Sequence, residues 1–120
     1  MLTYMYDKND NCLGMRMYKG KLELKMYRSH SARMNNDDTA MISLTDADLN
    51  NIIYHGREIR NVLFDGCMND IRKEMCITYN KDADMIEIHA DKQHGCVHHD
   101  VVFTVNGAKF VSTVYNEVMC

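Results

Sequence analysis

The chain lacks several features that mark particular classes of protein. Its 120 residues include no proline, no tryptophan and only six glycines, and we expect those glycines at the junctions between elements. No apolar run approaches the roughly 20 residues that a membrane-spanning helix needs. Charge appears at Asp7, before any apolar core of a secretory signal. The sequence therefore predicts a cytoplasmic protein without a signal peptide or membrane contact.

The cysteines also argue against secretion. They are odd in number and contain no Cys-x-x-Cys pair. Free thiols fit a reducing cytoplasm, including that of a virus-infected cell. Cys76 is expected to lie inert on a strand, and Cys120 to be the thiol most open to oxidation. The five are Cys12, Cys67, Cys76, Cys96 and Cys120.

No catalytic motif is present. The chain has no phosphate-binding glycine loop, no Gly-x-Ser-x-Gly and no His-Glu-x-x-His, so we expect a non-enzymatic protein without a cofactor. The densest group of metal-ligating residue types lies within 89–100. Strand alternation there would aim His94, Cys96 and His98 to one side, where zinc would fit. No standard ligand spacing is matched, and an ordinary polar loop is the other interpretation.

What is present is a globular composition with an uneven charge. The chain is 46% hydrophobic, with eleven methionines that suit an adaptable core, and its net charge is −3. Residues 61–120 hold five Lys/Arg against nine Asp/Glu, whereas residues 1–60 hold nine against eight. Within 16–33 there are six cations, and Glu23 is the only acid. The sequence thus predicts an acidic protein with one basic segment.

That basic segment coincides with a predicted β-hairpin. Residues 14–28 alternate at period two on either side of Lys19-Gly20. Five apolar residues can enter a core: Met15, Met17, Leu22, Leu24 and Met26. The opposite face would carry Arg16, Tyr18, Lys21, Glu23, Lys25 and Tyr27. Cations track phosphates and aromatic rings stack on unpaired bases, so this face suits single-stranded nucleic acid; an ordinary solvated face is the alternative.

The order of predicted elements is the same in both halves. Strands at 2–6, 14–28 (the hairpin) and 40–44 flank a polar loop at 29–39, and a helix runs from an N-cap at Thr45 to His55-Gly56. A strand at 61–64, a hairpin of 74–80 and 84–90, a polar loop at 91–96 and a strand ending at 105 repeat that order. The final helix begins after Asn106. Asn106-Gly107 also resembles a hairpin turn, but the helical spacing of the apolar residues that follow favours an N-cap.

These patterns predict an α+β fold of two ββββα repeats, 1–59 and 60–120, in one compact domain. Each repeat would be an antiparallel sheet followed by a helix, and the two would form an intramolecular pseudo-dimer. An offset of 61 aligns Leu49 with Phe110, Ile53 with Val114, Tyr54 with Tyr115 and Tyr18 with Tyr79. A unit of about 60 residues is marginal alone, so a shared core is physically sensible.

The hairpin and first helix carry a resemblance. The run 18–24, Tyr-Lys-Gly-Lys-Leu-Glu-Leu, followed by Ile42-Ser43-Leu44-Thr45, resembles the positive cofactor four family of single-stranded-DNA-binding transcriptional coactivators. The turn also looks like that of the Whirly proteins, which carry ββββα twice. The likeness covers about residues 14–53. The chain departs from the family at 46–48, where Asp-Ala-Asp replaces Pro-Glu-Gln, at Leu49, which replaces a tryptophan, and at the acidic Asp37-Asp38.

The resemblance implies a function and a set of residues. It implies single-stranded DNA or RNA binding in transcription, replication or repair, by a protein that we expect to be a homo-oligomer. The implied nucleic-acid-binding residues, together with Lys25 from the alternation, are Arg16, Tyr18, Lys19, Lys21, Lys25, Tyr27, Arg28, His30 and Arg33. The second repeat would be largely structural. The alternative is a small module encoded by a virus or mobile element, which keeps the fold but binds a host protein and not nucleic acid.

Overall fold

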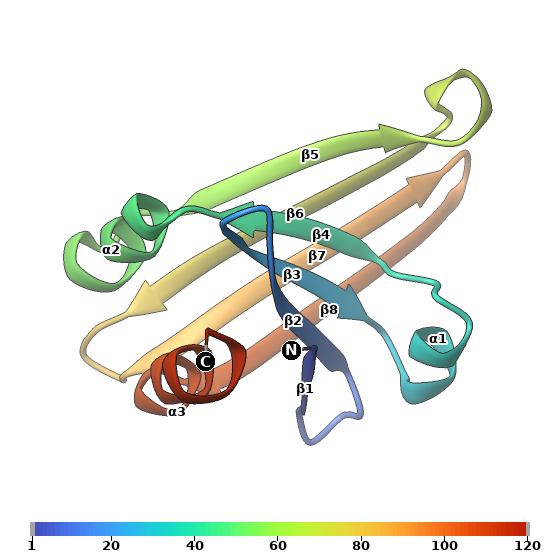
Figure 1. Ribbon diagram of the computed structural model, residues 1–120. Helices are drawn as coiled ribbons and strands as arrows, with labels where there is room; N and C mark the ends of the chain where they lie inside the picture. Colours follow the sequence, from blue (N-terminus) through green and yellow to red (C-terminus); the bar gives the residue numbers. More distant parts are fainter. Residues whose placement is uncertain (1, 120) are drawn as a thin grey trace.

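The computed structural model describes residues 2–119 and contains two four-stranded antiparallel sheets, each followed by a helix (Figure 1). The first sheet comprises β1 (Thr3–Tyr6), β2 (Cys12–Tyr18), β3 (Lys21–Tyr27) and β4 (Ala40–Leu44). The second comprises β5 (Ile59–Asp65), β6 (Ile71–Asn80), β7 (Met85–His94) and β8 (Val97–Asn106). In both sheets the strands lie side by side in chain order. The predicted α+β class is confirmed, and the order of the strands and of the two longer helices is compatible with two ββββα repeats. Cys120 lies outside the described residues.

The helical elements are short. They are α1 (His30–Met34), α2 (Asp46–His55), η1 (Cys67–Asn69) and α3 (Gly107–Thr113), which continues into η2 (Val114–Val118). None of the helices within residues 2–119 has the length and apolar character that crossing a membrane requires.

The β2–β3 hairpin forms where the alternation predicts it. Leu22, Leu24 and Met26 of β3 are buried, as is Met15 of β2. The turn at Lys19-Gly20 has both residues in the left-handed region, with φ of 52° and 78°. That backbone matches the right-handed twist of the flanking strands, and the glycine adopts it without steric cost.

The two sheets share one core. Their inner faces pack on each other, and Figure 1 shows the strands of β2–β4 crossing those of β5–β8 at a wide angle. The core joins side chains from both halves, including Met15, Leu24, Ile42, Ile77, Ile88, Phe103 and Phe110. Since each sheet buries its inner face against the other, burial of apolar area couples the halves.

Side chains cap the two longer helices at corresponding positions. The Thr45 hydroxyl accepts from the Asp48 N–H (3.1 Å), and the Asp48 carboxylate accepts from the Thr45 N–H (2.9 Å). This is a capping box. Asn106, 61 residues later, accepts from the Lys109 N–H at 3.0 Å. Asn106 is therefore the predicted N-cap of α3, and not part of a hairpin turn.

Two predicted loops are wrong. The segment 91–96 is not a polar loop, because β7 continues to His94 and only Gly95-Cys96 turns the chain into β8. Here the second sheet extends beyond the first (Figure 1), so polar residues cover both of its faces and hydrophobic alternation is lost. The segment 29–39 contains α1, which Ser29 caps by accepting from the Ala32 N–H at 3.0 Å.

The strand register corrects one predicted correspondence. The offset of 61 holds for β4 and β8 and for the helices. However, β6–β7 is joined by a four-residue turn and β2–β3 by a two-residue turn. The pairings Met17↔Leu22 and Tyr79↔Ile86 occupy the same place in their sheets. Met17, and not Tyr18, therefore corresponds to Tyr79, whose hydroxyl donates to Asp84 at 2.8 Å.

Candidate nucleic-acid interface

The tip of the β2–β3 hairpin places cations around an exposed ring. Tyr18 ends β2 directly opposite Lys21, and 46% of its surface is exposed. The guanidinium carbon of Arg16 lies 4.5 Å from the ring centroid, and Nζ of Lys19 lies 5.3 Å from it. Both distances are within the range of cation–π attraction. The tip thus combines a platform for stacking with positive charge.

The only acid in the basic segment is neutralised. Nε of Arg16 donates to Oε1 of Glu23 at 2.8 Å across the two strands, and the Glu23 side chain is almost fully buried. Within residues 2–119, Lys21 and Lys25 form no ion pair. These lysines are the cations best placed to contact an external anion.

A hollow of about 210 Å³ lies on the outer face of the first sheet. Gly14 lies beneath the rings there, since a Cβ at that position would come within 3.2 Å of Cε1 of Tyr4. The expectation that all glycines lie at junctions is wrong for Gly14, which lies inside β2.

Tyr27 also borders this hollow, but it is only 6% exposed. Its predicted role as a stacking platform is therefore not available in this conformation. The lining residues are Leu2, Tyr4, Gly14, Arg16, Glu23, Lys25, Tyr27 and Asn36.

Three predicted interface residues hold the α1 segment in place. Arg28 pairs with Asp37 (3.7 Å) and contacts the His99 ring of β8 (3.0 Å). The Arg33 guanidinium lies 4.3 Å from the centroid of the Tyr4 ring. His30 is hydrogen-bonded to the Tyr6 hydroxyl at 3.3 Å. These contacts within the chain occupy the groups that the sequence assigned to a ligand.

Lysines of the second repeat pair with the two carboxylates of the acidic turn after α1. Lys92 donates to Asp37 at 2.8 Å, and Lys73 lies 3.4 Å from Asp38. The hydrogen bond from Lys92, with the nearby charges of Lys92 and Arg28, lowers the pKa of the Asp37 carboxyl. The negative charge at Asp37-Asp38 therefore opposes nucleic acid less than the sequence indicates.

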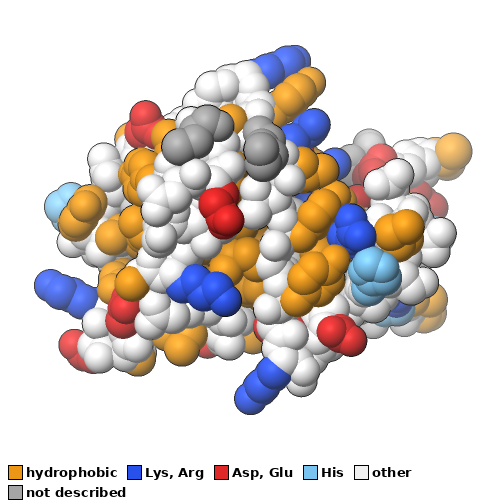
Figure 2. Space-filling model, turned by 60° about the horizontal axis from the view of Figure 1, so that its bottom comes forward, with side chains coloured by type: hydrophobic (Ala, Val, Ile, Leu, Met, Phe, Trp, Pro, Cys, Tyr) orange, Lys and Arg blue, Asp and Glu red, His pale blue; other side chains and the backbone are white. Residues whose placement is uncertain are grey.

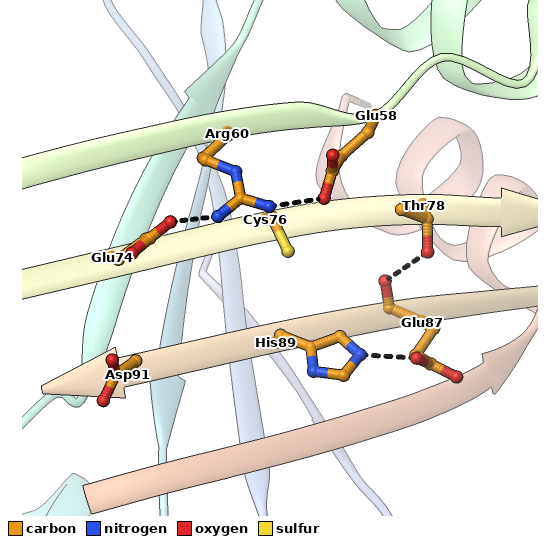
Figure 3. A pocket seen from close by; sticks show the side chains of 8 residues that line it. All are labelled: Glu58, Arg60, Glu74, Cys76, Thr78, Glu87, His89 and Asp91. Atoms are coloured by element: carbon orange, nitrogen blue, oxygen red, sulfur yellow. Dashed lines mark hydrogen bonds and ion pairs between the residues drawn. The ribbon is translucent and has the colours of Figure 1, made fainter. Parts of the chain in front are cut away.

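The second sheet carries a corresponding hollow of about 400 Å³ on its outer face (Figure 3). Strand register places six of its residues at positions matching those around the first hollow. His89 corresponds to Lys25, Thr78 to Arg16 and Cys76 to Gly14. The lining residues are Glu58, Arg60, Glu74, Cys76, Thr78, Glu87, His89 and Asp91.

The two hollows differ in charge. Arg60 is the one cation in the wall of the second hollow, and it pairs with Glu58 (2.9 Å) and Glu74. Arg72 also pairs with Glu74, at 2.8 Å. Hydrogen bonds from Arg60 and, to a smaller extent, Arg72 lower the pKa of the Glu74 carboxyl. Burial, together with the nearby Glu58, raises the pKa of the Cys76 thiol. The prediction that the second outer face is not basic is consistent with this wall.

The predicted His94, Cys96 and His98 zinc set is not brought together. The turn at Gly95-Cys96 reverses the chain, so His94 and His98 lie on different strands. His94 contacts Asp70 at 3.0 Å, while His98 faces Asp91 and Asp100 of the same sheet. The error has the same origin as the missed hairpin at 91–96, because alternation along one strand does not continue through a turn.

Lys and Arg side chains do not form a continuous basic surface on every face of the protein. Figure 2 shows the molecule turned by 60° from Figure 1; several Lys and Arg side chains lie near its upper right edge, and the others are scattered among apolar and acidic side chains. That face offers no continuous basic surface. The hairpin tip is distinguished by cations that surround an exposed aromatic ring.

Comparisons with known protein families, with curated proteins and with solved structures give no match for this chain. The resemblance to the positive cofactor four and Whirly families therefore stays a prediction from the sequence.

Proposed function

We propose that this protein binds single-stranded nucleic acid, DNA foremost, through the outer face of the β2–β3 hairpin. The observation that carries this proposal is the exposed Tyr18 ring, with Arg16 and Lys19 within 4.5 and 5.3 Å of its centroid and Lys21 directly opposite it. The ring would stack on a base while Lys19 and Lys21 neutralise phosphates. Such binding needs no chemical step, and it would serve transcription, replication or repair.

Fewer residues are available for the proposed interface than the sequence predicts. Arg28, His30, Arg33 and Tyr27 are engaged within the chain or buried. Arg16 is likewise paired with Glu23, so the residues that remain to contact nucleic acid are Tyr18, Lys19, Lys21 and Lys25. Base stacking contributes about 1–3 kcal/mol per base, and each phosphate contact adds to the salt dependence of binding.

We further propose that the two repeats form an intramolecular pseudo-dimer, which explains why one chain carries two versions of the same hollow. An apolar groove between α2 and the α3–η2 segment supports this arrangement. All eight of its lining residues fall into four pairs related by the offset of 61: Leu49/Phe110, Asn50/Val111, Ile53/Val114 and Tyr54/Tyr115. Lys25 in the first hollow has no ion pair among the described residues, whereas Arg60 in the second hollow is paired with Glu58 and Glu74. We therefore expect the first repeat to supply the binding site.

Fluorescence anisotropy with a labelled single strand of about 20 nucleotides, at about 50 and 200 mM salt, tests this function. Tyr18→Ala should weaken binding by about 1–3 kcal/mol. Lys21→Ala should weaken it and reduce the salt slope by about 1. Lys81→Ala, at the turn of the β6–β7 hairpin, and Tyr54→Ala, on the exposed face of α2, are matched controls that should leave binding unchanged. Absence of binding at the lower salt concentration would refute the proposal.

A second candidate function follows from the acidic outer face of the second sheet. Four carboxylates, from Glu58, Glu74, Glu87 and Asp91, line its hollow. Such a surface complements a basic surface on a protein, as expected for a module directed at a host factor. A preparation free of nucleic acid by its absorbance ratio, with no binding to the labelled strand but retention of a basic host protein, would favour this alternative.

A further inference from the structure

Three metal-ligating side chains meet on the outer face of β7 and β8. Asp91 and Asp100 are direct partners across the two strands, and His98 is two residues before Asp100 on the same face. Nε2 of His98 contacts Oδ1 of Asp91 and lies 3.5 Å from Oδ1 of Asp100. One ligand atom from each residue lies within 4.8 Å of the other two.

The charges in this cluster do not balance. Like charges directly opposite each other on neighbouring strands are destabilising, and Glu74 extends the row because it is the partner of Asp91 on β6. Glu74 is neutralised by Arg60 and Arg72. Within residues 2–119, the ion pairs of Asp91 and Asp100 are made only with His98, which is charged only when protonated.

The buried part of the cluster also favours a cation. Oδ1 of Asp91 is shielded from solvent and makes no hydrogen bond within the described chain. Its ion pair there is with Nε2 of His98. Shielding a carboxylate oxygen from water costs free energy unless a proton donor or a cation compensates it. Asp100, with its side chain 66% exposed, leaves the other side of the cluster open.

We propose that Asp91, His98 and Asp100 bind a divalent transition-metal ion, for which Zn²⁺ is the best fit. One imidazole nitrogen and two carboxylate oxygens form a donor set that zinc accepts. Tetrahedral zinc holds its ligand atoms roughly 3.3 Å apart, close to the 3.5 Å between His98 and Asp100. A metal ion binds a histidine through an imidazole nitrogen that carries no proton. Water completes the coordination on the open side.

Two other pairs provide internal comparisons. His94 contacts Asp70 at 3.0 Å, and His89 contacts Glu87. Neither pair belongs to a group of three ligands within the described part of the chain. A histidine beside one carboxylate is thus present elsewhere on this sheet, and His98 differs by having two.

Isothermal titration of the full chain with Zn²⁺ tests the proposal. Because thiols also bind zinc, Cys67, Cys96 and Cys120 are first replaced by serine. In this background we expect one Zn²⁺ per chain and a rise in unfolding temperature when zinc is added. His98→Gln and Asp100→Asn should each weaken binding at least tenfold and abolish the rise, whereas His94→Gln should change neither. Asp100→Asn keeps the shape of the side chain and removes a repelling charge, so it should fold.

Three results would overturn the metal site. The first is no zinc binding by the chain in which Cys67, Cys96 and Cys120 are serine. The others are zinc binding by His98→Gln and Asp100→Asn as strong as in that background, or a loss of affinity in His94→Gln as large as theirs. The site is independent of the proposed nucleic-acid function, since it lies on the other sheet. Binding of the labelled strand in the absence of zinc distinguishes the two.

Discussion

Tyr18 and Tyr27 show what a single residue's place in a pattern does and does not predict. Both lie on the outward face of the β2–β3 hairpin, as alternation indicates. Tyr18 is 46% exposed and Tyr27 only 6%. Tyr27 packs with Cys12 and Ala32, and Ala32 belongs to the α1 segment that folds back over this end of the sheet. Alternation assigns a residue to a face, but not to a partner that later covers it.

Glu74 provides a prediction at the scale of one residue. Its carboxylate accepts from Arg60 and Arg72, which hold its pKa below the ordinary value. The resulting stability is fully present above the unfolded pKa, about 4.3, and is lost as the pH falls through the lower folded pKa. Glu74→Gln should therefore lower the free energy of unfolding at pH 7 by about 1 kcal/mol.

Urea unfolding of wild type and variant at neutral and acidic pH measures this effect. The difference between them should shrink below about pH 4.3. Glu117→Gln, which removes an equal charge from an exposed position of η2, is the control and should stay within about 0.5 kcal/mol of wild type. A difference that does not change with pH would contradict the ion-pair explanation.

At the scale of elements, the caps and turns were predictable and the strand lengths were not. Thr45, Asn106 and Lys19-Gly20 act locally, so their roles can be recognised in a few consecutive residues. The ends of β7 and β8 depend on pairing between strands that extend beyond the core, where polar residues occupy both faces. The α1 helix escaped prediction because it has five residues, of which only Ala32 is buried.

Gly107, at the start of α3, yields a prediction for the junction of β8 and the helix. A Cβ there would lie 2.2 Å from Oδ1 of Asp84 and 2.7 Å from Cε1 of Tyr79. Gly107→Ala must therefore displace the Tyr79–Asp84 hydrogen bond, and we expect a loss of about 1–3 kcal/mol. Chemical denaturation measures it, with the exposed Ser112→Ala as control. A neutral Gly107→Ala would show that this junction is not tightly packed.

At the scale of the whole molecule, the shared core makes the halves interdependent. Phe103 of β8 is 1% exposed and packs in the cluster that contains Leu24 and Ile42 of the first sheet. Phe103→Ala should cost about 3–5 kcal/mol and destabilise both repeats together. Hydrogen exchange read by mass spectrometry would show protection falling equally in residues 21–44 and 85–106. Loss confined to the second sheet would mean that the repeats unfold as separate units.

The candidate site was predictable only where its residues are close together in the sequence. Arg16, Tyr18, Lys19 and Lys21 are close in sequence across one turn, so the hairpin alone brings them together. Arg28 and Asp37 were misjudged because their partners, His99 and Lys92, belong to the other repeat. The Asp91–His98–Asp100 cluster was missed because it requires the register of β7 with β8.

The sequence by itself determined the α+β class, the order of the strands and of the two longer helices, and the basic hairpin. Each of these depends on residues near one another in the chain, where periodicity, capping and turn preferences act. Only the tertiary structure decided which outward-facing groups stay exposed, which charges cancel and which ligands converge. Those outcomes depend on contacts between segments far apart in sequence, such as Lys92 with Asp37, and local preferences carry no information about which distant segments meet.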